Sequence, residues 1–541
     1  MIKNTLYALC IASLLSLGGC KGDWLDLSST VNANQSQMFT TTQTAMMAVD
    51  GLGRLMHDDV NTSTAAQCGY ETWMIWMSMM GENLVFTFDG AQFKPQAGWT
   101  MHRGLTYNGL KYHYATFYRF VSNATAILTN IDQATGTETE KENIKGQAYA
   151  YRAFAYFQLV QAWGKRFDYD NPANNDEPNS GVILRNTEQL TFDNQARSTV
   201  NEVYQQINSD IDNAVKCLTA TTVVRTNKTY INRYVAEGLK ARILLAQGKW
   251  EEAALLAKDV VEHSGAKLQA DTYTTTTNRM MDSGNSEWLW CKIGLVDEVE
   301  HTLKNFESFM SNMNVSYNRK SPRAIYNQLY NRIPDTDVRK AIWLPYAPDA
   351  TSMPRPIVPT NGIVVNYMSN KFIVSDPAAK VADVPYMRLP EMMLIEAEGY
   401  ARAGKYGEAA QALYPLASAR DPQYQLSTKT GQELIDEIMF QRSVELWGEG
   451  FRWPDLKRLN MPLDRGPAPR TELGYNGTIW TIENGGMPED FDPEASNFDM
   501  YDTGKIINPD SRYIPAGDKR WQFLIPNTET DINPLCVQNE L

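Results

Sequence analysis

Side chains suited to stacking on sugar rings gather in one part of the sequence, between about residues 60 and 110. A flat aromatic face fits the apolar C–H face of a pyranose, whereas Arg and Asn side chains form hydrogen bonds with its hydroxyl groups. Trp99 stands in a stretch that contains Pro and Gly and has no helical or strand period to direct its indole into a core. We therefore predict that Trp99 forms part of a ligand platform, with Arg103 and Asn108 as partners for hydroxyl groups.

Two interpretations fit Trp73 and Trp76, which stand three residues apart beside several methionines. They belong to the same ligand platform, or they form the buried face of a helix. Another cluster of the same chemical type comprises Tyr317, Asn318 and Arg319. A third aromatic group is a candidate contact with a partner protein, and it comprises Tyr475, Trp480, Tyr501 and Tyr513.

Catalysis has little support in the sequence. A glycosidase places two carboxylates about 5 to 10 Å apart across the sugar bond. Glu396 and Glu398 are two residues apart on a predicted helix, so they point in different directions. No Gly-x-Ser-x-Gly elbow, phosphate loop or His-Glu-x-x-His motif occurs. The sequence therefore predicts a protein that is not an enzyme.

The block from Arg442 to Arg458 combines acidic and basic residues with aromatic ones. Glu445 and Glu449 follow Arg442 at helical spacing, where ion pairs along one face account for the charges. We expect Trp453 and Pro454 to end this helix, because proline cannot continue it. The block is therefore predicted to be structural.

Metal and thiol chemistry also have weak support. Residues 168–177 offer many oxygen ligands and could form a calcium site, but Pro172 breaks the EF-hand spacing. We favour a polar solvated turn there and expect no cofactor. Four cysteines of the mature chain form no CxxC pair and no short-spaced cluster: Cys68, Cys217, Cys291 and Cys536. Two alternatives are open for them, disulfide bonds or buried free thiols.

The first nineteen residues read as a lipoprotein signal peptide. Lys3 supplies a positive charge, and residues 6–17 form an apolar segment too short to span a bilayer. Leu17-Gly18-Gly19-Cys20 then matches a bacterial lipobox, in which the cysteine sulfur takes a diacylglycerol before cleavage. Two or three acyl chains such as palmitate bury enough methylene groups to hold a protein on a membrane. We predict that Cys20 is acylated and anchors the chain.

Composition narrows the class of protein further. The chain has 541 residues, of which 43% are hydrophobic and 21% charged, as in globular proteins. Its formal net charge is −13, and no basic run could follow a phosphate backbone, so nucleic acid is not an expected partner. The 27 Tyr, 18 Phe and 13 Trp exceed what a helical core of this size requires, which places some of them on a binding surface.

Helical periodicity dominates the middle of the chain. Apolar residues recur at intervals of three and four over 112–131, 144–163, 199–218 and 230–247. The segment 248–254 (GKWEEAA) has a near copy at 404–410 (GKYGEAA), typical of the helix pairs of tetratricopeptide repeats. We predict that residues 20–541 form one all-α dominated domain with a tetratricopeptide-like scaffold over 110–263, 386–458 and the C-terminal segment. Loop-rich insertions with short strands are expected at about 60–110, 265–385 and 459–520.

These residues resemble the SusD/RagB family of Bacteroidetes outer-membrane glycan-binding lipoproteins. Several independent blocks occur in the family's order, which is more specific than any one of them alone. The matching segments are Trp24-Leu25-Asp26 after the lipobox Cys20, residues 118–124, 146–157 and 388–398, the block 442–458, and Ile525-Pro526 near the end of the chain.

The resemblance implies helix pairs that carry an irregular loop-rich half, no catalysis, and a partner of the SusC class, a TonB-dependent barrel. The expected function is capture of an oligosaccharide on the outside of the outer membrane and its delivery to that transporter. A protein of the same fold that binds peptides or another non-sugar nutrient is the alternative. The pocket loops share no motif with the family, so binding residues cannot be transferred one by one.

Overall fold

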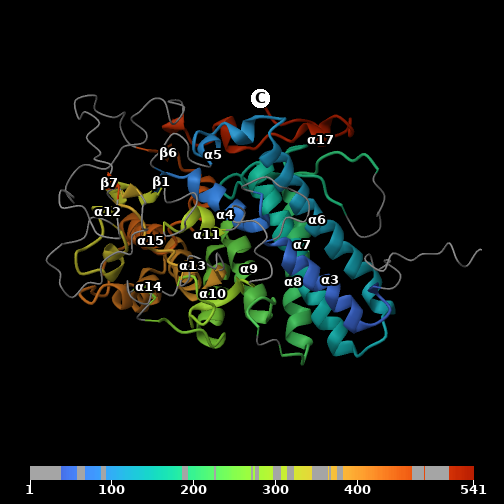
Figure 1. Cartoon of the computed structure of the whole chain (residues 1–541), viewed down its shortest axis with the longest axis horizontal. Helices are drawn as coiled ribbons and strands as arrows, with labels where there is room; N and C mark the ends of the chain where they lie inside the picture. The colour runs from blue at the N-terminus through green and yellow to red at the C-terminus, as the bar shows by residue number, and fades with distance from the viewer. Residues whose placement is uncertain are drawn as a thin grey trace, which may run out of the picture.

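Helices make up most of the described part of the chain (Figure 1). The computed structural model describes residues 38–57, 67–86, 93–185, 193–224, 227–269, 272–273, 280–295, 306–312, 322–343, 363–364, 367–374, 382–465, 480–481 and 511–541. The α-helices are α3 (Thr42–Leu55), α4 (Gly69–Met79), α5 (Lys94–Ala97), α6 (Asn108–Asn130), α7 (Glu138–Trp163), α8 (Val200–Ala220), α9 (Arg233–Ala246), α10 (Trp250–His263), α11 (Phe306–Met310), α12 (Asn327–Tyr330), α13 (Leu389–Arg402), α14 (Tyr406–Arg420), α15 (Gly431–Glu445), α16 (Arg452–Arg458) and α17 (Asn527–Thr530).

Local sequence signals fix where the long helices begin. Thr137 accepts a hydrogen bond from the backbone N–H of Glu140, whose carboxylate accepts in return from the N–H of Thr137. Thr199 and Glu202 form the same reciprocal pair at the start of α8. Each pair satisfies two backbone donors that a helix N-terminus leaves free. The predicted helices over 144–163 and 199–218 are confirmed as parts of α7 and α8.

The scaffold is a row of helices packed side by side in chain order: α6, α7, α8, α9, α10, α13 and α14, with α15 against α13 and α14. Buried ion pairs connect helices of the scaffold. Arg152 of α7 donates to both carboxylate oxygens of Asp210 on α8 at 2.6 and 2.8 Å. Arg242 of α9 binds Glu391 of α13 at 2.5 and 2.6 Å. The predicted all-α, repeat-like scaffold is confirmed.

The repeated segment builds the same turn twice. Gly248 and Gly404 adopt φ angles of 70° and 78°, a left-handed conformation that glycine tolerates at the end of a helix. The following lysines bond back to the preceding helix in the same way. The N–H of Lys249 donates to the carbonyl of Leu244 at 3.0 Å, and that of Lys405 to the carbonyl of Tyr400 at 2.9 Å. The pairs α9–α10 and α13–α14 are therefore two copies of one motif.

Strands occur as short antiparallel pairs around the scaffold. They are β1 (Leu84–Phe86) with β3 (Arg323–Ile325), β2 (Trp288–Lys292) with β5 (Val384–Arg388), β4 (Ile363–Val364) with β7 (Trp480–Thr481), and β6 (Leu463–Asp464) with β8 (Tyr513–Ile514). The segment of about 60–110 is less loop-rich than we predicted, since it contains α4. Every residue of α4 is buried, so the helix is surrounded by core and shows no amphipathic period.

The four cysteines of the described residues are free and buried, which favours the thiol alternative over disulfides. Burial raises the pKa of the Cys217 and Cys291 thiols to about 12, so the reactive thiolate is scarce at neutral pH. None of the helices in the described part of the chain has the length and apolar character needed to cross a membrane.

Candidate functional site

The indole of Trp99 is buried rather than presented to a ligand. Its exposed fraction is 3%, and its Nε1 donates a hydrogen bond to the carbonyl of Met80 at 2.9 Å. The ring lies edge-on to Trp521, with ring centres 4.8 Å apart. The prediction of an exposed stacking platform at Trp99 is therefore wrong. A φ of 53° at this residue sets a turn in which the indole contacts Met80 and Trp521, residues distant in sequence that no local period reveals.

Trp73 and Trp76 form the buried face of a helix, the second of the two interpretations. Each is 1% exposed on α4. Trp73 stacks on Trp163 of α7 with ring centres 5.6 Å apart, and its Nε1 donates to the side-chain oxygen of Gln158 at 3.1 Å. Trp76 packs against His113 of α6, so both indoles belong to the core and offer no face to a sugar.

Arg103 and Asn108 also lie apart from any aromatic platform. The guanidinium of Arg103 donates to the backbone carbonyls of Gln522 at 2.8 Å and Glu540 at 2.5 Å, which ties the C-terminal segment to the core. Asn108 is exposed at the first residue of α6. The described residues do not include Cys20, Tyr317, Asn318, Arg319, Tyr475 or Tyr501. Of the remaining aromatic candidates, Trp480 belongs to β7, and Tyr513 of β8 is 55% exposed.

The block 442–458 does not form one helix ended by proline. Helix α15 stops at Glu445, and the chain turns through Gly448 and Gly450, whose φ angles are 77° and 89°. A new helix, α16, starts at Arg452 and carries Pro454 in its first turn, where a missing N–H costs nothing. The expected end of the helix at Trp453 and Pro454 is thus corrected.

The charges of this block lie in a buried ionic network. The carboxylate of Glu445 accepts hydrogen bonds from Arg339, Arg388 and Arg420 at 3.1 to 3.2 Å, and all four side chains are at most 1% exposed. Burial opposes ionisation of Glu445, but the arginines, led by Arg420 and Arg388, outweigh it and hold its pKa well below the usual range.

Glu449 extends the same network. Its carboxylate accepts from Arg388 at 2.6 Å and from the ammonium of Lys371 at 2.7 Å. Lys371 also donates to the carbonyls of Glu445 and Trp447, which holds the turn after α15 in place. Every charge in the network has a partner, so the predicted structural role of the block stands.

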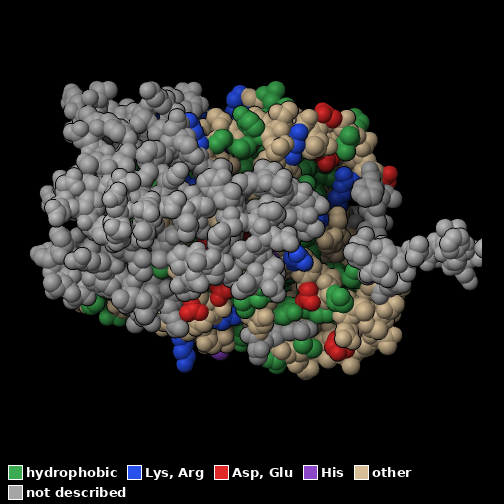
Figure 2. Space-filling view, viewed as in Figure 1, with side chains coloured by type: hydrophobic (Ala, Val, Ile, Leu, Met, Phe, Trp, Pro, Cys, Tyr) green, Lys and Arg blue, Asp and Glu red, His purple; other side chains and the backbone are tan. Residues whose placement is uncertain are grey.

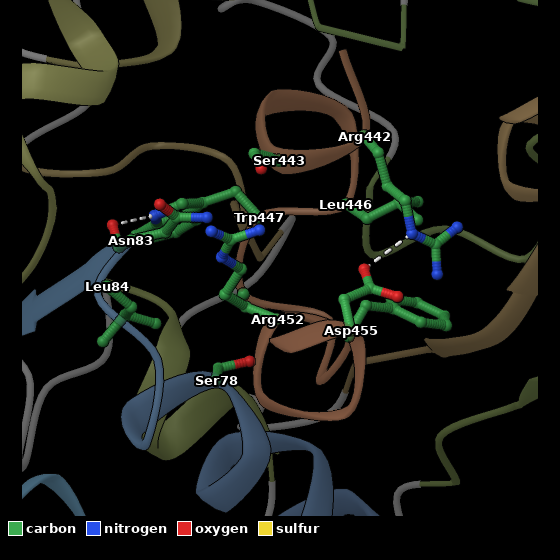
Figure 3. A pocket seen from close by; sticks show the side chains of 11 residues that line it. Ser78, Asn83, Leu84, Arg442, Ser443, Leu446, Trp447, Arg452 and Asp455 are labelled. Carbon is green, nitrogen blue, oxygen red and sulfur yellow. Dashed lines mark hydrogen bonds and ion pairs between the residues drawn. The ribbon is translucent and has the colours of Figure 1, made fainter. Parts of the chain in front are cut away.

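A small pocket beside this block is shown in Figure 3. At one side of it Arg442 donates to Asp455 at 2.7 Å, and at the other the indole of Trp447 donates to the carbonyl of Asn83 at 2.8 Å. The pocket has a volume of about 20 Å³. That volume accommodates a water molecule or two and no sugar ring.

A larger, polar cleft lies between the loop after α7, the end of α16 and the C-terminal segment. Its volume is about 780 Å³, and its lining comes from residues 165–180, Arg197, residues 456–461 and residues 517–540. Pockets that hold small ligands typically occupy 300–1,000 Å³. This cleft therefore has room for an oligosaccharide.

The floor of the cleft is rigid. The buried guanidinium of Arg197 donates to the carbonyls of Gly181 at 2.7 Å and Trp163 at 3.1 Å. The ammonium of Lys457 donates to the carbonyls of Gln161 at 2.5 Å and Gly164 at 2.9 Å, at the end of α7. Burial lowers the pKa of Lys457 to about 7. Both basic side chains therefore hold backbone segments together.

The charges at the rim of the cleft are already paired. Lys165 lies 2.5 Å from Glu177, and Arg166 lies 3.0 Å from Asp168. Lys519 lies 3.6 Å from Glu540. Side chains in these rim pairs are partly exposed, so the pairs are solvated, but each formal charge has an opposite charge beside it.

The loop 168–177, the alternative calcium site, is closed by its own residues. Asp168 accepts hydrogen bonds from the Asn174 side chain at 2.8 Å and from the backbone N–H groups of Asp170 and Asn171 at 3.2 and 3.1 Å. Partial burial opposes ionisation, but these donors, led by Asn174, lower the pKa of Asp168. Within the described residues, no group of three or more His, Cys, Asp or Glu side chains is placed to hold a metal ion.

Two rim residues keep their polar groups available. Asn179 and Asn460 adopt φ angles of 61° and 52° on two loops that line the cleft, and the side-chain amides of both make no hydrogen bond within the described part of the chain. Met461 follows Asn460 and is 40% exposed. Sequence reasoning missed these residues, because they come from segments some 280 residues apart and form no linear motif. The one local signal was an Asn in each loop, a residue that tolerates positive φ.

Two family models match the chain. One, described as "Starch-binding associating with outer membrane", matches residues 23–245, and the other, described as "SusD family", matches residues 308–541. The chain belongs to the SusD family. A SusD-like protein of Formosa agariphila is 24% identical over 419 residues, which cover 68% of this chain and 75% of that protein.

Solved structures of SusD-like proteins share the fold. A SusD-like carbohydrate binding protein from Bacteroides vulgatus aligns over 92% of this chain and 98% of its own, with a TM-score of 0.72 and 22% identity. Surface glycan-binding protein A from Bacteroides thetaiotaomicron, solved in complex with laminarihexaose, aligns over 92% of this chain and all of its own, with a TM-score of 0.63 and 14% identity. The SusD architecture is thus conserved where sequence identity is low.

Proposed function

We propose that this SusD-family protein captures oligosaccharides at the outer surface of the outer membrane. The observation that carries the proposal is the pair of family matches, one of which is described as starch-binding and associated with the outer membrane. A structural neighbour holds laminarihexaose on the same fold. The polar cleft beside the C-terminal segment has the volume for such a ligand.

The second part of the proposal is delivery. The bound saccharide passes to a TonB-dependent barrel of the SusC class, and acylation of Cys20 keeps the protein beside that transporter. An acyl anchor holds a protein on a membrane without any spanning helix. The protein binds and transfers its ligand and does not cleave it; in support of this, Glu445 of the block 442–458 lies in a buried network of paired charges.

Binding to an oligosaccharide array, followed by calorimetric titration of each sugar bound, tests the capture function. We expect binding to one class of oligosaccharide without release of smaller products. Binding to a peptide library and to no sugar would favour the alternative, a nutrient-binding protein for peptides.

Delivery is tested separately in the native host. Affinity purification after gentle detergent extraction is expected to recover a large outer-membrane barrel at similar stoichiometry. The variant Cys20→Ala is expected to leave the membrane pellet for the soluble fraction, whereas Cys10→Ala, a change within the signal peptide, is the matched control and should not. Recovery of the protein alone would contradict the partnership.

A further inference from the structure

We propose that a cavity between α4, α7, α9, α15 and α16 binds a small inorganic anion such as chloride. The cavity has a volume of about 50 Å³ and shares no lining residue with the polar cleft beside the C-terminal segment. That volume holds a few water molecules or a halide ion and is well below the size of pockets that hold larger ligands. The site is therefore distinct from any place where a saccharide binds.

Three side chains that line the cavity have hydrogen-bond donors to spare. Arg442 is 4% exposed, and within the described residues its one hydrogen bond runs from Nε to Asp455 at 2.7 Å, which leaves both terminal nitrogens unused. The hydroxyl of Tyr70 makes no hydrogen bond in the described part of the chain. Gln158 accepts from Trp73 through its oxygen, and its nitrogen has no acceptor among the described residues. Unused donors in a buried site favour a ligand that accepts hydrogen bonds.

An aromatic contact fixes the guanidinium of Arg442. Its Cζ lies 5.2 Å from the ring centre of Phe451, and the Cζ of Arg242 lies at the same distance from that ring. In Figure 3 the terminal nitrogens of Arg442 point away from Asn83 and Trp447, and thus away from the smaller pocket drawn there. A donor that is already ordered loses little conformational entropy when a ligand binds.

Positive charges outnumber negative ones around the cavity. Within the described residues, four arginines form ion pairs with three carboxylates: Arg242 with Glu391, Arg402 and Arg458 with Glu398, and Arg442 and Arg458 with Asp455. The adjacent pair of Arg452 and Glu82 does not change this difference. One positive charge is therefore left over, and a buried charge is costly without a counter-ion.

The buried network around Glu445 shows the opposite balance. It joins four cations to four carboxylates, namely Arg339, Lys371, Arg388 and Arg420 with Glu287, Asp337, Glu445 and Glu449. That network needs no further ion. A water molecule in the cavity would satisfy donors but leave its extra positive charge, whereas a halide ion does both. Gln161, Phe451 and Pro454 line the cavity and are partly exposed, so an ion can enter from solvent.

The test measures chloride binding by the full chain. Broadening of the chloride NMR signal reports bound ion directly, and thermal melts compare sodium chloride with sodium gluconate at equal ionic strength. Gluconate is larger than the cavity and gives the same screening. Tyr70→Phe removes one donor and keeps the ring, and Arg442→Gln removes the charge. Tyr204→Phe is the matched control, because this buried tyrosine of α8 lies outside the cavity and its hydroxyl has no hydrogen bond within the described residues.

We expect the wild-type protein to broaden the chloride signal and to melt at a higher temperature in chloride than in gluconate, since an ion that binds the folded state stabilises it. Tyr70→Phe should weaken chloride binding about tenfold, because a hydrogen bond to a charged group is lost. Arg442→Gln should abolish the broadening, and Tyr204→Phe should bind as the wild type does.

The inference is overturned if the wild type neither broadens the chloride signal nor distinguishes the two salts. It is also overturned if Tyr70→Phe binds chloride as tightly as Tyr204→Phe, a comparison that decides the matter even where Arg442→Gln fails to fold. Saccharide capture is measured separately on the array, so either result leaves the proposed function standing.

Discussion

Two regions of the molecule are rich in charged and amide side chains, and they serve opposite purposes. Around Glu445 the charges are enclosed between α13, α14 and α15, and three arginines converge on one carboxylate. In the cleft beside the C-terminal segment similar side chains line open space, and the amides of Asn179 and Asn460 remain unengaged within the described residues. Residue type alone therefore does not distinguish a structural site from a binding site.

The two regions differ in whether their charged side chains are buried or exposed to solvent. A buried charge must be paired and hydrogen-bonded, or the fold loses several kcal/mol. A solvated charge is screened and contributes little to stability. The first region should therefore respond to mutation through folding, and the second through ligand affinity. Figure 2 shows polar, charged and hydrophobic side chains interspersed on the described part of one face.

The largest effect is expected for Glu445→Gln. The change keeps the shape but leaves three buried arginines with too little negative charge, so the free energy of unfolding should fall by about 5 kcal/mol. Chemical denaturation followed by circular dichroism measures it. Glu433→Gln, at an exposed residue of the same helix, is the control and should cost less than about 1 kcal/mol. Equal stability of the two variants would contradict the assignment of a structural network.

Trp99→Ala should also act on folding. The buried indole packs against Trp521 and bonds the Met80 carbonyl, so its loss should reduce stability by about 3 kcal/mol. Thermal melts measure this, and titration of the folded variant should give a wild-type affinity for the sugar. A normally stable variant with weakened binding would instead restore Trp99 as a ligand contact.

The two glutamates Glu396 and Glu398 on α13 should make the stability of the protein depend on pH in opposite directions. Burial opposes ionisation of Glu398, but Arg458 and Arg402 outweigh it and lower its pKa from 4.5 to about 2. Its contribution to stability is therefore present above pH 4.5 and is lost as the pH falls toward 2. Burial raises the pKa of Glu396 from 4.5 to about 7. The effect of Glu396 therefore depends on pH in the opposite direction, and the free energy of unfolding falls as the pH rises from 4.5 through 7.

Denaturation curves collected from pH 2 to pH 8 check this pair. Glu398→Gln should lower stability at neutral pH and flatten the acid limb of the profile. Glu396→Gln should remove the decline between pH 4.5 and 7 and leave the acid limb intact. Identical profiles for the two variants would show that their environments do not differ as the structure indicates.

The smallest effect is expected at the rim of the cleft. Lys165 and Glu177 are about half exposed, so Lys165→Ala should change stability by less than about 1 kcal/mol. It should also remove the partner of Glu177 and leave an unbalanced negative charge beside the ligand. We expect little change in affinity for an oligosaccharide that carries no charge. A loss of several kcal/mol in stability would show that this pair behaves like the buried network.

The sequence alone determined the features that depend on neighbours a few residues apart. Apolar spacing of three and four residues predicted α6, α7, α8 and α9, since one face of each helix is buried. The copied Gly-Lys turn predicted that α9–α10 and α13–α14 are equivalent, because a left-handed glycine ends a helix wherever it stands. The relation of Glu396 to Glu398 followed from helical geometry in the same way.

Only the tertiary structure decided the features that depend on distant segments. Trp99 looked exposed because the residues that cover it, such as Trp521, come from the far end of the chain. Glu445 gains its partners from Arg339, Arg388 and Arg420, and the cleft unites residues near 179, 197, 460 and 538. Burial and hydrogen bonding between such segments depend on how the whole chain packs, and no local period or propensity encodes them.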